Sequence, residues 1–295
     1  MAKDISSRPS AFHVLTGLFS LPAGARIGPG PMIAAAILLA IVLASICAPL
    51  YVPYDPMDMN SLARLKPPSD AHLLGTDQYG RDIFSRVMTG GRVSLLIGVG
   101  AACVSVLTGL LIGLVAGFFR AVDGIVMRIM DSLMAIPAIL LAIALVALNG
   151  PSLGSVIIAI TIPEVPRVVR LVRSVVLGAR EEPYVEAAIA LGSSMPKILI
   201  QHLMPNTLAP LIVQGTYICA SAILIEAILS FLGAGVSTEI PTWGNIMAEG
   251  RTFFQIKPGM IFWPGLLLSL CILAINLLGD TARDLLDPRL KKREG

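Results

Sequence analysis

Long apolar runs separated by shorter polar segments dominate this chain. A transmembrane helix needs about 20 mainly apolar residues to cross roughly 30 Å of hydrocarbon, and five runs meet that length: residues 31–51, 93–118, 124–148, 207–231 and 259–279. A sixth run, residues 152–173, is weaker because it is interrupted at Pro163. We count it as a span, kinked at Pro163 and Pro166, because the arginines near its end can reach lipid headgroups. The pattern therefore predicts an all-α polytopic membrane protein with about six transmembrane helices.

Composition supports a membrane location for the whole chain. Hydrophobic residues make up 55% of the 295 positions and charged residues 14%, with a mean hydropathy of +0.81. A soluble domain of this size has no interior large enough to bury that much apolar surface, so the bilayer must act as the solvent.

The basic residues predict the orientation. Six spans put both termini on one side, and most of the 22 Lys and Arg residues fall in segments on that side. The positive-inside rule then places both termini in the cytoplasm. The predicted parts are a cytoplasmic N-terminal segment 1–30, an uncleaved anchor 31–51, an outer loop 52–92, a core domain 93–280 and a cytoplasmic tail 281–295.

The outer loop ends in a predicted interfacial helix. Its apolar stripe consists of Ile83, Phe84, Val87 and Met88, and its polar side consists of Arg81, Asp82, Ser85 and Arg86. Thr76 or Asp77 is placed to cap it. We interpret the basic residues as facing solvent or headgroups; the alternative is a docking surface for an outer partner.

The inner segment 181–206 predicts a compact helix–turn–helix. Glu181, Glu182 and Pro183 favour a helix start. An apolar face recurs at helical spacing through Tyr184, Ala187, Ala188 and Leu191. Gly192 suits the left-handed end of that helix, Ser194 is placed to cap a second one, and Pro205-Asn206 ends it and begins the next span. Such a loop either docks into a groove of a partner or lies on the inner leaflet.

The sequence contains no motif for nucleotide binding or metal binding. The chain contains neither Gly-Lys-Ser nor Gly-Lys-Thr, so it has no phosphate-binding loop of the P-loop type. The three histidines are far apart, and the four cysteines lie in separate apolar runs, with no metal-ligand spacing. We therefore expect a non-catalytic chain with no metal site, no cofactor of its own and no nucleic-acid partner.

Ionisable residues inside the predicted spans are costly in hydrocarbon and need partners or a function. Arg128 and Asp131 lie three residues apart, and we predict a structural ion pair between them. Glu164 is expected to contact Arg167, with either a structural or a gating role. Glu226 is expected near the outer face, close to water, as a structural carboxylate or a substrate contact.

Part of the inner segment resembles a known coupling motif. Glu186-Ala187-Ala188, then Gly192 and Leu203-Met204-Pro205, resemble the EAA loop of bacterial ABC importer permeases. The match departs from the usual isoleucine–any–leucine–proline ending, because Leu203 and Pro205 are displaced from the strict pattern.

Other segments resemble a narrower group, the C-type permease subunits of dipeptide, oligopeptide and nickel importers. The matching segments cover residues 72–77, 80–82, 92–95, 229–233 and 279–289. This resemblance implies a type I ABC importer-like permease fold in a bacterial inner membrane. It also implies four kinds of partner: a second permease subunit of the B type, two ATP-binding subunits that hold ATP and Mg, an extracytoplasmic binding protein, and membrane lipid.

The resemblance further implies that the loop transmits closure of the ATPase to the spans. The expected cargo is a di- or oligopeptide. Two alternatives stay open from the sequence: an importer of nickel or another small solute, and a secondary transporter driven by an ion gradient.

Overall fold

The computed structural model describes residues 28–286. Most of the predicted N-terminal segment 1–30 (residues 1–27) and most of the predicted tail 281–295 (residues 287–295) lie outside the described residues. The described part is helical apart from turns and a single β-bridge between Thr76 and Asp82. Its helices are α2 (Pro29–Tyr51), α3 (Ile83–Phe118), α4 (Arg120–Met134), α5 (Ala138–Asn149), α6 (Leu153–Arg180), α7 (Pro183–Ala190), α8 (Met195–Ile198), α9 (Met204–Phe231), α10 (Trp243–Gly250) and α11 (Gly259–Leu286).

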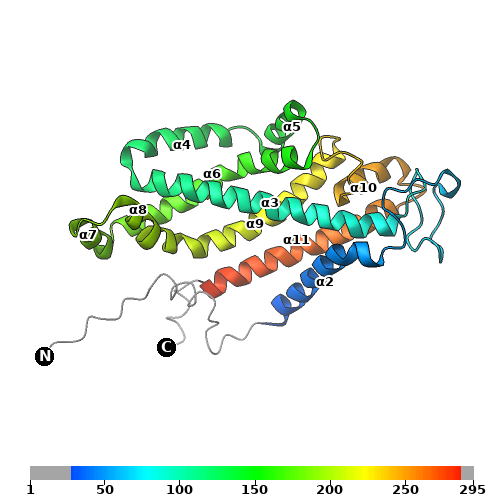
Figure 1. Ribbon diagram of the computed structural model, residues 1–295, viewed down its shortest axis with the longest axis horizontal. Helices are drawn as coiled ribbons and strands as arrows, with labels where there is room; N and C mark the ends of the chain where they lie inside the picture. Colours follow the sequence, from blue (N-terminus) through cyan, green and yellow to red (C-terminus); the bar gives the residue numbers. More distant parts are fainter. Residues whose placement is uncertain (1–27, 287–295) are drawn as a thin grey trace.

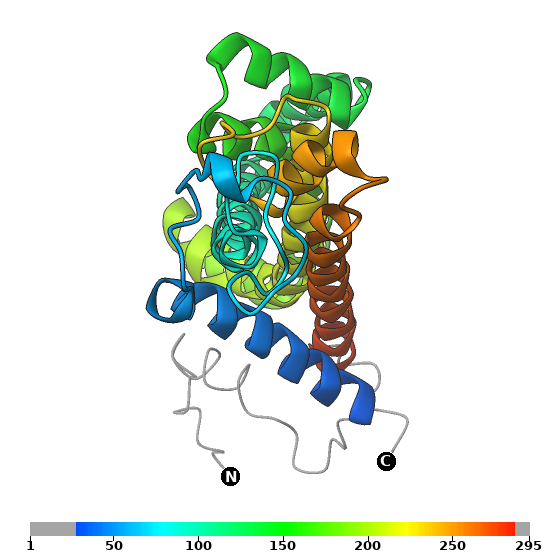
Figure 2. The ribbon, with the colours of Figure 1, turned by 90° about the vertical axis from the view of Figure 1, so that its right-hand side faces the viewer.

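The long helices lie side by side and run between two ends of the molecule (Figure 1). One end, which we call the loop end, carries α7 and α8, and both the start of α2 and the end of α11 point toward it. The opposite end carries the segment between α2 and α3 together with α10, and these cover the helix ends in Figure 2. The described chain therefore enters and leaves the bundle on the side of the inner segment.

Four helices, α2, α3, α9 and α11, are long and apolar enough to cross a membrane. The predicted span 124–148 is not one straight helix, because α4 and α5 meet at a bend of 89°. Pro137 lies at this break, where its missing N–H and its ring prevent the helix from continuing. If the bent pair counts as one span, it is the fifth.

The predicted weak span corresponds to α6, which is helical for 28 residues. Pro163 and Pro166 both lie inside this helix without ending it. Charged residues at 164, 167 and 170 explain its weak apolar signal. The kink at the two prolines stays a prediction.

Close packing between α3 and α6 depends on glycines. Gly109, Gly113 and Gly117 repeat every four residues on α3, and each faces a valine of α6. A Cβ built at Gly113 would lie 2.6 Å from Cβ of Val172, and one at Gly117 would lie 2.7 Å from Cβ of Val176. Such spacing lets two helix backbones approach closely within a membrane. α6, which leads directly into α7, is therefore held tightly against α3.

The predicted interfacial helix is the first part of α3, which runs unbroken for 36 residues. Its cap is Asp82, whose carboxylate accepts from the Ser85 N–H at 2.8 Å, and not Thr76 or Asp77. Ile83 and Val87 of the predicted stripe are buried. The two elements are one because no residue between them interrupts the helical hydrogen bonds.

The prediction that the basic residues of this helix face solvent is wrong. The side chains of Arg81 and Arg86 are 2% and 0% exposed. Arg86 lies 2.5 Å from Asp77 and 2.7 Å from Glu249, and Arg81 bonds the same two carboxylates at 2.6 and 2.5 Å. Buried charges require such pairing, and the partner Glu249 comes from α10, far from both arginines in sequence. This buried charge cluster ties the outer segment to α10.

Candidate functional site

The first helix of the loop, α7, begins as the sequence predicts. Pro183 occupies its first turn, where the absent N–H costs nothing. Glu186 also lies in the first turn, where its charge favours the positive end of the helix dipole. The side chain of Glu186 is exposed and has no partner among the interactions of the described residues.

The residue that terminates α7 is Gly192, as predicted: the helix is capped by Leu191, and Gly192 follows directly. Gly192 has a φ of +75°. This is the left-handed conformation that glycine adopts without strain. Its N–H donates to the Ile189 carbonyl at 2.9 Å, and the Ser193 N–H donates to the Ala188 carbonyl at 3.0 Å. These two bonds form a Schellman motif, which satisfies carbonyls at the helix end. A Cβ added at Gly192 would meet nothing within 4 Å, so the backbone conformation alone requires glycine.

The apolar face predicted for α7 is only partly buried. Val185 and Ala188 are buried, and Val185 packs in the interior with Val176, Ile198 and Leu203. The rest of the apolar side chains form an exposed surface at the loop end, which we call the loop patch: Tyr184, Ala187, Ile189, Leu191, Met195 and Ile200. Leu191 is 82% exposed. An exposed apolar surface of this kind can be covered by a partner or by lipid.

The second half of the loop differs from the prediction. Met195 to Phe231 form one continuous helical stretch, so Pro205 does not break it. Instead a π-helical turn, Leu199–Leu203, connects α8 to α9, and Pro205 lies in the first turn of α9. The wider π-helical turn lets the helix continue although Pro205 has no N–H to donate. Leu203 is fully buried.

Hydrogen bonds join the loop to the long helices. The Arg180 guanidinium, at the end of α6, donates to the Phe118 carbonyl at the end of α3 at 3.2 Å. The Asn206 amide, on α9, donates to the Tyr184 hydroxyl of α7 at 3.1 Å. The Asn206 bond therefore joins α7 to α9, and the Arg180 bond joins α6 to α3 just before the loop begins.

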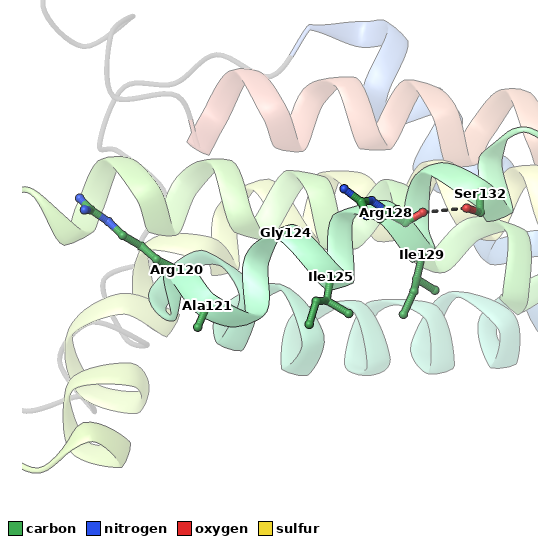
Figure 3. A pocket seen from close by; sticks show the side chains of 7 residues that line it. All are labelled: Arg120, Ala121, Gly124, Ile125, Arg128, Ile129 and Ser132. Carbon is green, nitrogen blue, oxygen red and sulfur yellow. Dashed lines mark hydrogen bonds between the residues drawn. The ribbon is translucent and has the colours of Figure 1, made fainter.

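The predicted ion pair between Arg128 and Asp131 is wrong. Asp131 instead pairs with Arg170 of α6 at 2.5 Å, and Asp123 pairs with Arg173, whose Nη2 lies 2.6 Å from Oδ2. Arg128 lines a shallow hollow of about 360 Å³ on the other side of α4 (Figure 3). Residues three apart on a helix can pair, as Glu164 and Arg167 do, but here α6 packs against α4 and brings Arg170 to Asp131.

Glu164 contacts Arg167, as predicted, with Nη1 at 3.0 and 3.1 Å from the two carboxylate oxygens. The Glu164 side chain is 2% exposed, whereas Arg167 is 53% exposed. The contact compensates the buried carboxylate with an arginine that still reaches the surface of the chain.

Glu226 lies at the outer end of α9, as predicted, but it is 0% exposed, so the predicted access to water is wrong. Its carboxylate accepts from the Ser230 hydroxyl at 2.8 Å and from the Ser94 hydroxyl at 3.4 Å. The Ser94 hydroxyl also accepts from the backbone N–H of Trp243 at 3.2 Å. The packing of α10 over α9 covers Glu226, which joins α3, α9 and α10.

The described residues 28–286 contain no group of three His, Cys, Asp or Glu side chains that is arranged to hold a metal ion. The features that the structure does show are an exposed loop patch, a hydrogen bond from α7 to α9, and a buried charge cluster at the opposite end.

Comparison with known protein families identifies the family of this chain. Residues 109–292 match the family described as the inner membrane component of binding-protein-dependent transport systems. The chain belongs to this family. Residues 29–68 of the permease also match the N-terminal transmembrane domain of oligopeptide transport permease C.

Relatives of the permease cover nearly its whole length. It is 51% identical over 265 residues to a protein of Sinorhizobium fredii named "Probable peptide ABC transporter permease protein", covering 90% of this chain and 91% of the relative. It is 43% identical to a dipeptide transport system permease protein of Alkalihalophilus pseudofirmus, covering 86% and 84%. A glutathione transport system permease protein of Pectobacterium atrosepticum is 39% identical, covering 86% and 85%.

Among solved structures, the permease resembles a chain of the MetNI methionine ABC transporter with a TM-score of 0.51 at 20% identity. The match covers 68% of the permease and 97% of that chain. This likeness supports the predicted type I importer-like permease fold.

Proposed function

We propose that this permease takes up di- or oligopeptides that an extracytoplasmic binding protein delivers, and that partner ATPase chains drive the transport. The observation that carries the proposal is the exposed loop patch around Glu186–Gly192, which is bonded to α9 through Asn206. The patch follows directly on α6, whose last residue, Arg180, bonds to α3. Burial of such a patch in a partner would couple movement of that partner to the spans.

The proposed site for the ATPase consists of the residues that resemble the EAA loop: Glu186, Ala187, Ala188, Gly192, Leu203 and Pro205. Ala187 and Glu186 are exposed on α7 and would contact the ATPase directly. Ala188 and Leu203 are buried and would hold the shape of the loop. ATP and Mg would be bound by two ATP-binding subunits, because this sequence has no P-loop.

In this proposal the loop end faces the cytoplasm of a bacterium and both termini lie there. Basic residues support this orientation, because Arg173, Arg180 and Lys197 lie at or near the loop end. A second permease subunit would complete the passage. Glu164 and Glu226, both buried within the single chain, would support the helices rather than contact the peptide.

Peptides are the proposed cargo because the relatives described above carry names of peptide, dipeptide and glutathione transport systems. The test uses the complex of the permease with its partner chains in proteoliposomes, with radiolabelled dialanine and trialanine and the binding protein. We expect uptake that requires ATP, the ATPase chains and the binding protein. Uptake that follows a proton or sodium gradient without the ATPase would overturn the proposal, and ATP-driven uptake of nickel instead of peptide would overturn the cargo.

A further inference from the structure

The two sides of α9 differ in chemistry at the same depth of the bundle. One side, with Leu208, Ile212, Gly215 and Cys219, borders an apolar groove of about 580 Å³ shared with α2, α3 and α11. The other side carries Asn206, Pro210, Gln214 and Tyr217 at helical spacing. Gln214 and Ile212 are two residues apart, hence about 3 Å apart along the axis and on opposite sides of the helix.

The polar side of α9 borders a crevice at the loop end. It encloses about 570 Å³, and α6 and α11 supply the remaining walls with Leu171, Arg283 and Leu286. The Tyr217 hydroxyl donates to the carboxylate of Asp280 on α11 beside it. α9 and α11 meet closely here, because a Cβ added to Gly279 would collide with Thr216. The crevice therefore combines a guanidinium, a phenol and two carboxamides, and the Asp280 carboxylate lies beside it, bonded to Tyr217.

These polar groups are incompatible with a lipid-facing position. Gln214 and Tyr217 lie within the apolar span 207–231, where an amide or hydroxyl in hydrocarbon costs free energy unless it is hydrogen-bonded. Asp280 and Arg283 lie at the end of α11 near the loop end and are exposed in the single chain, so they require water, headgroups or a partner. The apolar groove on the opposite side of α9 carries no comparable penalty and suits lipid tails. α9 thus separates a side for lipid from a side for water.

The crevice is also linked to the loop patch. Asn206 lines the crevice, and its amide donates to the Tyr184 hydroxyl on α7 at 3.1 Å and to the His202 carbonyl at 2.6 Å. A partner that moves α7 therefore moves a crevice-lining residue directly. This contact joins the crevice to the coupling site.

We propose that this crevice is the loop-end section of the peptide pathway. The proposal rests on the proposed function, because it assigns a place to the cargo of that transporter. The ligand is a zwitterionic peptide: Asp280 and Arg283 match its two charged ends, and Gln214 and Asn206 match its backbone amides. These contacts are few, which allows a peptide to leave after it enters.

The test compares Gln214→Cys with Ile212→Cys, each in a permease whose four native cysteines are replaced by alanine, assembled with its partner chains in proteoliposomes. A charged methanethiosulfonate reagent is applied from the loop side. We expect it to modify Gln214→Cys at least about tenfold faster than Ile212→Cys, because hydrocarbon excludes a charged reagent. Transported dialanine and trialanine should slow the modification of Gln214→Cys.

Equal reactivity of the two cysteines, or cross-linking of Gln214→Cys to the second permease subunit with no protection by peptide, would overturn the pathway assignment. A second measurement avoids dependence on the cysteine-free background. Gln214→Trp, which fills the crevice, should abolish peptide uptake, whereas Ile212→Trp should retain it, with both variants co-purifying with the ATPase. Equal uptake in the two variants overturns the crevice proposal alone; loss of ATP-driven uptake in the unmodified complex overturns the proposed function.

Discussion

The charged guanidinium of Arg86 has no exposed surface and is buried at the end of the molecule opposite the loop end. The cluster around it is balanced, with two arginines and the two carboxylates of Asp77 and Glu249. In a site of low dielectric constant, the loss of one member leaves the others uncompensated. The stability of the outer end therefore depends on single residues.

Removal of Glu249 should destabilise the permease strongly. Glu249→Ala leaves two buried arginines with one carboxylate, and the expected loss in free energy of unfolding is about 3–5 kcal/mol. Thermal unfolding of the detergent-purified protein measures the effect. The matched control is Glu239→Ala, which removes an exposed carboxylate of the same outer end. This control should change stability by about 0.5 kcal/mol or less. Equal effects of the two substitutions would show that the cluster contributes nothing.

Gly192 allows a second test at this scale. Proline fixes φ at about −65° and has no N–H. The native φ of Gly192 is +75°, and its N–H bonds the Ile189 carbonyl, so Gly192→Pro is incompatible with this turn. We expect normal membrane insertion but at least about a tenfold loss of ATP-driven uptake and weaker co-purification of the ATPase, because a strain of about 1–3 kcal/mol distorts the loop patch. Glu186→Lys, which reverses the charge in the first turn of α7, should act in the same direction.

The control for Gly192→Pro is Gly154→Pro, which places proline in the first turn of α6, where it is tolerated. Gly154 has nothing within 4 Å of an added Cβ. Normal uptake and normal ATPase co-purification in both Gly192→Pro and Glu186→Lys would refute the coupling role of the loop.

Among the elements, α3 and α6 form the contact on which the loop depends. Glycines of α3 receive valines of α6 over successive helical turns, so the helices have no room to slide apart or together without loss of packing. The loop follows α6 without a flexible linker, since Arg180 ends α6 and Pro183 begins α7. In the proposed function, this close contact would allow α6 to transmit movement from the loop.

A methyl group added to this contact should be costly. In Gly113→Ala the new Cβ lies 2.6 Å from Cβ of Val172. We expect a loss of about 1–3 kcal/mol from overpacking. Gly215→Ala is the control, because its Cβ would meet only Val106 at 3.5 Å, an ordinary contact. Unfolding temperatures in detergent compare the two. An unchanged Gly113→Ala protein would mean that α3 and α6 separate easily.

At the scale of the whole molecule, α7, which carries part of the loop patch, and α10, which carries Glu249 of the charge cluster, lie at opposite ends of the long helices (Figure 1). The proposed pathway requires a definite orientation of these ends. We predict that Leu191→Cys, 82% exposed at the loop end, reacts with a membrane-impermeant maleimide only from the cytoplasmic side. Leu62→Cys, 87% exposed at the other end, should react only from outside. The reverse pattern would invert the proposed topology.

Several features followed from the sequence alone. Long apolar runs located α2, α3, α9 and α11, because hydrocarbon thickness sets the length of a span. Pro183 and Gly192 located the ends of α7, because proline and glycine act through their own backbone geometry. Family motifs distributed along the chain indicated a permease of an ABC importer. Each of these signals is local in sequence.

Only the tertiary structure decided which charged groups meet. Asp131 is three residues from Arg128 but pairs with Arg170, and Arg86 finds Glu249 at a separation of 163 residues. It also decided which side of an amphipathic helix is buried, since Val185 packs inward and Leu191 remains exposed. The crevice beside Gln214 was equally hidden, although polar residues at helical spacing within a span were its signal. The physical reason is common to all: ion pairs, burial and clefts depend on which helices become neighbours, and local sequence does not specify that.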